Sequence, residues 1–189
     1  MNHYIQAAKS YLLAHKKDIS TAAPIVICLA FLIGIVVYAT VRNMPNIVYQ
    51  PVKACDLLTP AKAQDLLGDH VFNVDSKLPV IAGDNATSKC GFSDANEDAN
   101  QMAVAAVAIR SGINDKGDAK NKADFRVKKA GANTQVVNDL GDSAYYDLKL
   151  GQLNVLDGHN WFIFSNGPGN APEANTLEKS LELAHKIIK

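Results

Sequence analysis

Hydrophobic and polar positions divide the chain into one long apolar run followed by short alternating segments. The 23 residues Ile19–Val41 carry no charged side chain, and the run is densest over residues 24–41. A helix of roughly 20 residues crosses the ~30 Å hydrocarbon layer of a bilayer and satisfies its own backbone polar groups there. The pattern therefore predicts a single-pass transmembrane helix at residues 24–41.

Charges on either side of this run predict its orientation. Three lysines and the free amino group precede the run, whereas Arg42 and Lys53 follow it. The bias favours a cytoplasmic N-terminus. We therefore expect a short cytoplasmic segment at residues 1–23, a span in the cell membrane, and an extracytoplasmic C-terminal part.

A cleaved signal peptide is the competing interpretation of the apolar run. A basic region precedes the run, and Val37 and Ala39 are small enough to precede a cleavage point. The run is longer than the usual ~7–15 residues, and its leading region is long. Both features favour a retained anchor.

Two prolines separate the apolar run from the rest of the chain. Residues 42–54 contain Pro45 and Pro51 and show no periodicity of apolar positions. This composition predicts an extended stalk. The remaining residues, 55–189, are then expected to form one extracytoplasmic domain.

The first residues of this domain have the pattern of a short helix. Thr59 suits an N-cap, Pro60 suits the first helical position, and Gly68 suits a helix end in a left-handed conformation. The pattern predicts a short amphipathic helix. Three residues share its apolar face: Ala63, Leu66 and Leu67.

Short alternating segments predict five strands after this helix. One contains Phe92 and the next spans Val104–Ile109, with a polar turn between them. Three further strands are expected at residues 143–150, 152–156 and 160–165. The sequence Asp157–Gly158–His159 between the last two is a hairpin signal.

Two more helices are expected among and after the strands. One runs from about Ala119 to Lys129, with Phe125 and Val127 as its apolar contacts. The other is C-terminal and should lie across the sheet. Its apolar stripe comprises Ala174, Leu177, Leu181, Ala184 and Ile188. This order of elements, with short hairpin links, predicts an α+β domain with an antiparallel sheet packed by helices.

Charge then limits the partners of the domain. Residues 43–189 contain 15 Lys and Arg against 18 Asp and Glu, a net charge of −3 with histidines neutral. A chain of this length can bury a single core. The mixed, faintly acidic surface predicts no nucleic-acid binding, so the expected partners are the membrane and an envelope protein or an apolar ligand.

Cysteine usage agrees with export. Cys28 lies in the apolar run, which leaves Cys55 and Cys90 beyond it. An even pair in an exported domain predicts a disulfide, because such domains meet an oxidising environment; two unpaired thiols are the alternative. Structural zinc needs four ligands, and neither cysteine has a His or Cys partner nearby, so we expect no metal and no cofactor.

Several motifs, taken in order, resemble a known family. They are the opening CDLLTP…LLG, the second cysteine in KCGF, the phrase DLGDSAYY, and the C-terminal amphipathic helix. Together they resemble a family of small exported bacterial lipoproteins of unknown function, over Cys55 to Ile188. The resemblance implies that Cys55 pairs with Cys90, and it supplies no catalytic residues. The chain departs from the family by carrying an apolar span in place of the lipid-attachment cysteine.

Aromatic residues gather in the predicted C-terminal strands. By alternation, Trp161 and Ile163 face one side of the sheet and Phe162 and Phe164 the other. The available helices favour a core on both sides, whereas an uncovered side would expose an aromatic patch for a partner. If one side is uncovered, the candidate binding surface comprises Tyr145, Tyr146, Trp161 and Phe162.

Two sites that resemble catalytic or metal chemistry are incomplete. His159 lies beside Asp157 in the predicted turn, without a nucleophile that it could activate. Residues 94–98 imitate the opening of a calcium loop, but Ala99 replaces its turn glycine and Ala105 its bidentate glutamate.

Known catalytic signatures are also missing from the sequence. It contains no nucleophile elbow, no zinc-protease motif and no phosphate-binding loop. We therefore expect a membrane-anchored extracytoplasmic binding or interaction module of the cell envelope. An envelope-acting enzyme of an unrecognised type is the alternative.

Overall fold

The structure is a computed structural model that describes residues 48–94, 102–168 and 174–188. The predicted cytoplasmic segment and membrane helix lie outside the described residues. Within those three ranges, no helix is both long enough and apolar enough to cross a membrane.

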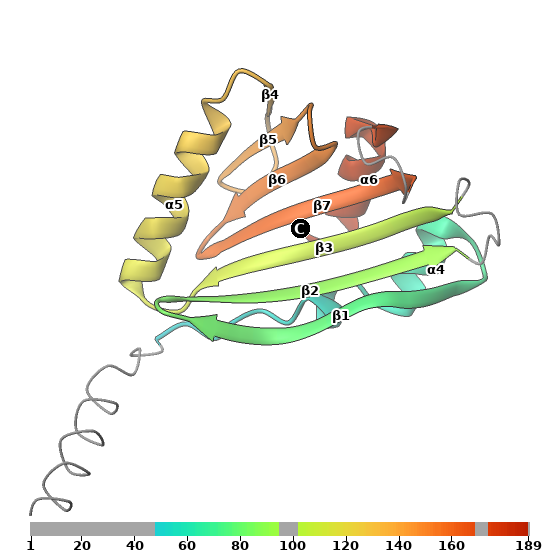
Figure 1. The fold of residues 1–189 in the computed structure, drawn as a ribbon, viewed down its shortest axis with the longest axis horizontal. Coiled ribbons are helices and arrows are strands. Elements are labelled where there is room, and N and C mark those ends of the chain that lie inside the picture. Colours follow the sequence, from blue (N-terminus) through green and yellow to red (C-terminus); the bar gives the residue numbers. More distant parts are fainter. Residues whose placement is uncertain (1–47, 95–101, 169–173, 189) are drawn as a thin grey trace, which may run out of the picture. The chain divides into compact units, whose positions relative to one another are not determined.

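Seven antiparallel strands form one sheet in the order β1-β2-β3-β7-β6-β5-β4 (Figure 1). Their bounds are β1 Val71–Ala82, β2 Asn85–Asp94, β3 Ala103–Gly112, β4 Thr134–Val137, β5 Ser143–Asp147, β6 Gln152–Asp157 and β7 Asn160–Pro168. The α+β architecture on an antiparallel sheet, predicted from the sequence, is confirmed. So is the tight hairpin between β6 and β7, in which Asp157 pairs with Asn160.

Helices pack against both faces of the sheet. Those in the described ranges are α3 Ala54–Leu57, α4 Pro60–Leu67, α5 Asp115–Lys129 and α6 Leu177–Ile187. Residues of α3, α4 and α6 join the large hydrophobic core on one face. Helix α5 packs on the other face, at one end of the strands (Figure 1).

The large core fills the face under α3, α4 and α6. Val107 of β3, Leu153 of β6 and Phe164 of β7 are 0–1% exposed and point into it. Leu58, which follows α3, and Leu183 of α6 close the core from the helix side, both fully buried. Burying a side chain of this size contributes roughly 1.5–3 kcal/mol, so this face supplies most of the hydrophobic stabilisation.

A smaller core lies under α5. Phe125 is 1% exposed, and its ring centroid lies 5.0 Å from that of Tyr145 and 5.5 Å from that of Trp161, both edge to face. Gly117 lets the helix approach the β1–β2 turn, because a Cβ at this position would lie 1.9 Å from the Asp84 carbonyl oxygen. The predicted contact at Phe125 is confirmed, but the one at Val127 is wrong, since Val127 is 75% exposed.

Both amphipathic helices at the ends of the domain are confirmed. Thr59 caps α4 by accepting a hydrogen bond from the Lys62 amide at 3.4 Å, and Gly68 ends the helix with φ +99°. Thr176 caps α6 in the same way. The cap sets the start of α6 at Leu177, so Ala174 precedes the helix and is exposed, contrary to the predicted stripe.

Other element boundaries differ from the predicted ones for local reasons. Helix α5 begins earlier than expected, because the Asn114 side chain accepts a hydrogen bond from the Gly117 amide at 2.9 Å. Strand β5 ends at Asp147, whose carboxylate accepts from the amides of Lys149 and Leu150 at 3.0 Å each. Strands β1 and β4 and the single turn α3 were not predicted.

The start of the described chain is attached to the domain. A disulfide joins Cys55 in α3 to Cys90 in β2, which confirms the predicted pairing. Before it, the amide of Val48 donates to the Ile113 carbonyl at 2.7 Å, and the amide of Val52 donates to the Ser111 hydroxyl at 3.1 Å. The described part of the predicted stalk, residues 48–54, therefore lies along the domain, and its last residue, Ala54, begins α3.

Candidate functional site

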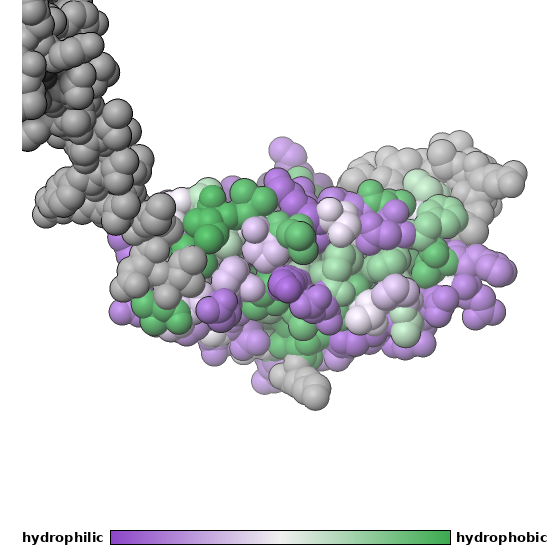
Figure 2. Space-filling model, turned by 90° about the horizontal axis from the view of Figure 1, so that it is seen from below, coloured by the Kyte–Doolittle hydropathy of each residue, from purple (hydrophilic) through white to green (hydrophobic). Residues whose placement is uncertain are grey.

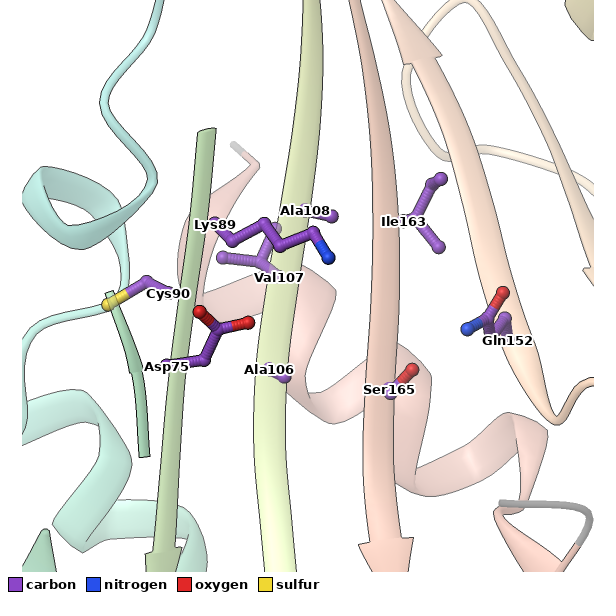
Figure 3. Close-up of a pocket in the computed structure, with 9 residues that line it drawn as sticks. All are labelled: Asp75, Lys89, Cys90, Ala106, Val107, Ala108, Gln152, Ile163 and Ser165. Carbon is purple, nitrogen blue, oxygen red and sulfur yellow. The ribbon is translucent and has the colours of Figure 1, made fainter. Parts of the chain in front are cut away.

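Much of the face that carries α5 is covered by no helix of the described ranges. We call this uncovered part the open face. Its side chains come from β1, β2, β3, β6 and β7, and comprise Asp75, Lys89, Gly91, Ala106, Ala108, Gln152, Ile163 and Ser165. Figure 3 shows these strands with the helices of the large core behind them.

Small residues lie side by side on the three central strands of the open face. Gly91 is opposite Ala106, and Ala106 is opposite Ser165. In the next row, Ala108 lies between Lys89 and Ile163. Because such short side chains do not fill the space above the sheet, they leave a hollow of about 170 Å³ (Figure 3).

An irregularity in β1 forms one wall of this hollow. The register with β2 shifts between Asn73 and Asp75, which brings Val74 and Asp75 over Gly91. A Cβ on Gly91 would lie 3.6 Å from the Asp75 Cβ and 3.4 Å from the Ala106 Cβ. Glycine at this position therefore keeps the floor of the hollow deep beside the edge strand.

Charged and polar groups surround the small floor. Lys89 extends its chain across β3, and the Asp75 carboxylate lies on the same side of the sheet (Figure 3). Ser165 and Gln152 add a hydroxyl and an amide at the opposite side of the hollow. Within the described ranges, neither Asp75 nor Lys89 forms an ion pair, so both keep their charge available to a ligand.

Helix α5 packs over one end of β3 and β7 and forms the boundary of the open face there. Arg110 of β3 forms an ion pair with Asp124 of α5 at 2.8 Å, and its guanidinium carbon lies 6.0 Å from the centroid of the Trp161 ring. The hydrogen bond from Arg110 holds the pKa of the Asp124 carboxyl below its ordinary value. The Trp161 indole donates to the Asn154 side chain at 2.9 Å, so its polar group is satisfied under the helix.

The four aromatic residues proposed from the sequence as a binding surface are all buried. Tyr145 and Trp161 lie under α5, with 2% and 7% exposed, and Tyr146 and Phe162 lie in the large core, with 4% and 5% exposed. Burial, together with the charge of Asp147, raises the pKa of Tyr145 to about 12. The predicted alternation and the favoured core on both sides of the sheet are confirmed at these positions, so these residues supply no exposed surface.

His159 takes part in a contact with the start of the described chain. Its ring stacks on that of Tyr49 at a centroid distance of 3.5 Å, and its Nδ1 lies 3.4 Å from a carboxylate oxygen of Asp118. The Tyr49 hydroxyl donates to the Asp115 carboxylate, a bond that raises the pKa of Tyr49. These contacts attach Tyr49 to the β6–β7 turn and to the start of α5. In the described ranges, the side-chain contacts of His159 are with Tyr49 and Asp118.

A second, more open hollow of about 460 Å³ runs along α5. It is lined by Lys122, Phe125, Arg126, Asp142, Ser143 and Leu156. Lys122 is already paired with Asp118 at 2.8 Å, and Phe125 belongs to the small core. This hollow follows the packing of α5 and has no floor of small residues built across several strands.

Metal-binding groups are not assembled in the part of the chain that the structure describes. Most of the segment that resembles a calcium-binding loop, residues 95–100, lies outside the described residues. Asp94 lies at the end of β2, and its carboxylate accepts a hydrogen bond from the Ala103 amide at 3.1 Å. This contact joins the ends of two neighbouring strands.

Residues of the open face were not identified from the sequence. Gly91, Ala106 and Ser165 are ordinary small residues, and only the register of three strands brings them together. The one available signal was the pair Ala106 and Ala108, which alternate with the larger Val107 and Ile109 along β3. Such alternation indicates a face with little side-chain volume.

Comparison of the chain with family models, with curated proteins and with solved structures finds no match. The resemblance to exported lipoproteins therefore stays a prediction from the motifs.

Proposed function

We propose that this protein is a membrane-anchored binding module of the cell envelope, and that it captures a partner protein through the hollow of the open face. In this proposal, residues 24–41 hold the chain in the membrane, and the domain lies on the extracytoplasmic side. The observation that carries the proposal is the floor of Gly91, Ala106, Ala108 and Ser165, on the part of this face that no described helix covers.

The size of the hollow supports a side chain of a partner as its occupant. Sites for drug-sized ligands and cofactors usually measure ~300–1,000 Å³. The hollow, at about 170 Å³, is smaller and close to the ~150 Å³ of an engineered cavity that binds benzene. One aromatic or large aliphatic side chain fits a space of this size, with Lys89 beside it to bind polar groups of the same partner.

The disulfide supports the proposed compartment. Disulfides persist in oxidising environments and are rare in the cytosol. The bond between Cys55 and Cys90 is therefore what a domain on the outer side of the membrane would carry. The uncharged run Ile19–Val41 is the feature of the sequence that would hold the domain there.

Photo-crosslinking in intact cells tests the proposal. A benzophenone amino acid replaces Gln152 at the side of the hollow, and in a second strain it replaces exposed Ala61 on α4, on the opposite face of the sheet. We expect a discrete adduct with another protein at position 152 and none at position 61. Mass spectrometry of the adduct identifies the partner.

Filling the hollow provides the matched control. Ala106→Met should occupy the floor and abolish the adduct at position 152, whereas Ala61→Met adds the same atoms elsewhere and should leave it unchanged. Both variants should unfold within a few degrees of the parent protein. An adduct that survives Ala106→Met, or equal adducts at both positions, would contradict the proposal.

A further inference from the structure

Strand β1 presents an edge on which apolar side chains are concentrated. It pairs only with β2, and in the described ranges no other backbone group bonds to its outer side. Of the ten large hydrophobic side chains that are exposed in the described structure, five belong to this strand: Phe72, Val74, Leu78, Val80 and Ile81, each 44–73% exposed. Figure 2, seen from below Figure 1, shows hydrophobic surface among polar residues on the side where β1 lies. Exposed edges of this kind are templates for pairing with another strand.

Two opposite charges lie at the centre of this strand. Asp75 and Lys77 flank Ser76, and both point to the open face, opposite Gly91 and Lys89 of β2. Lys77 is thus next to a like charge across the strands, which is destabilising. In the described structure neither Lys77 nor Lys89 has an acidic partner, so an incoming carboxylate beside Lys77 would relieve the repulsion.

We infer that a second copy of this chain pairs with β1, antiparallel and centred on Ser76. In that register each Asp75 lies opposite Lys77 of the other copy, which makes two opposite-charge pairs. The apolar residues then also lie opposite one another: Phe72 with Val80, Val74 with Leu78, and Val71 with Ile81. Strand β1 is therefore complementary to itself in both charge and hydrophobicity.

The pleat of the sheet agrees with this register. Phe72, Asp75, Lys77 and Val80 pair with alternate residues of β2, so the residues brought opposite one another share a face. Their partners are Ser93, Gly91, Lys89 and Thr87. A slip by one residue would place them on opposite faces. The paired copies form one continuous sheet with both hollows on the same side. The inference needs no ligand in the hollow and so goes beyond the proposed function.

Charge disfavours the neighbouring registers. A shift that preserves the faces moves the pairing by two residues, and it places either Asp75 or Lys77 opposite its own copy. Like charges directly opposite are destabilising. Lys77, Pro79 and the two irregularities of β1 are features that keep an edge strand from pairing indiscriminately. Among the registers that preserve the faces, only the one centred on Ser76 places Asp75 opposite Lys77, so that the charges attract.

Disulfide trapping tests the register. Two differently tagged full-length chains that lack Cys28 (Cys28→Ala) are co-expressed, one with Asp75→Cys and the other with Lys77→Cys. Opposed residues of antiparallel strands have Cα atoms about 4.5–5.5 Å apart, within the range that a disulfide spans. We expect a covalent dimer that contains both tags when the two variants are mixed.

Each variant expressed alone provides the control for the alternative registers. The proposed register predicts little crosslinked dimer with Asp75→Cys alone or with Lys77→Cys alone. Strong crosslinking of one of them alone would show a register shifted by two residues and would overturn the proposal. Absence of crosslinks in the mixture would overturn pairing through β1 altogether.

Charge exchange provides an independent measurement on the full-length protein in detergent. Asp75→Lys and Lys77→Asp should each weaken self-association by about tenfold or more, because each creates two like-charge contacts. The double variant should restore the affinity to within about threefold of the parent. Lys128→Asp, on the exposed surface of α5, makes the same charge change as Lys77→Asp and should have no effect. Failure of the double variant to recover would overturn the register. The crosslink at position 152 to a different protein remains a separate test of the proposed function.

Discussion

Neighbouring residues of β7 enter two different environments. Phe164 is fully buried in the large core, against residues of α6 and β6, whereas Ile163 and Ser165 are half-buried on the open face beside a hollow. The first face is closed by three helices and one disulfide, and the second is closed only at one end, by α5. The face that carries the large core therefore supplies most of the stability, and the open face has side chains that are accessible to a partner.

The largest effect should come from breaking the closed face. Phe164→Ala should lower the free energy of unfolding by about 3–5 kcal/mol, because it leaves a cavity in a fully packed core. Ile163→Ala, one residue away on the open face, should cost about 1 kcal/mol, since its side chain is only half-buried. Urea unfolding of the two variants measures the contrast, and equal losses would show that the open face is packed as tightly as the closed one.

The disulfide should come next in size. Replacing both Cys55 and Cys90 with alanine should lower the free energy of unfolding by about 4 kcal/mol in the chain-entropy model, since the bond closes a loop between residues 35 positions apart. Cys28→Ala removes the cysteine that takes no part in this bond and is the matched control. A double variant as stable as this control would mean that the packing around α3 holds without the bond.

Alkaline pH should produce a smaller effect that is specific to the core under α5. The pKa of Tyr145 is raised to about 12 in the folded protein, above the ordinary value of 10. Its contribution to stability is therefore complete below pH 10 and is lost as the pH rises from about 10 to 12. Tyr145→Phe removes this titration and should flatten the decline in stability measured over that range. An unchanged decline would place the cause in other groups, such as Tyr146, whose pKa is also raised.

The sequence predicted the closed face better than the open one. Local features of the sequence predicted this face, and the structure confirms them. They are the alternation of apolar residues in β3 and β7, the helix cap at Thr59 and the hairpin turn at Asp157–Asn160. Strand β1 escaped prediction because it is exposed on most of its length, shifts register twice and contains Pro79, so its apolar residues do not alternate cleanly. Alternation alone does not predict that Tyr145 and Trp161 are buried, because their burial depends on the position of α5.

The hollow could not be located from the sequence, for a physical reason. Gly91, Ala106 and Ser165 are distant along the chain, and their shared property is the absence of side-chain volume. Only the registers of β2 with β3 and of β3 with β7 place them in one row. The alternating Ala106 and Ala108 indicate small side chains on β3 alone. The sequence has no pattern of charge or hydrophobicity that would show which residues of β2 and β7 lie beside them.

Thiol labelling on the open face tests the central claim most directly. In the Cys28→Ala background, Ser165→Cys is labelled with N-ethylmaleimide in the purified full-length protein and in intact cells, and each rate is divided by that of Ala61→Cys on exposed α4. An open face that binds a partner predicts a ratio in cells at least about tenfold lower than the ratio for the purified protein, in which Ser165 is half-buried and still accessible to the reagent. Equal ratios in the two conditions would show that no partner occupies the face, and a purified protein that is not labelled at position 165 would show that the face is covered.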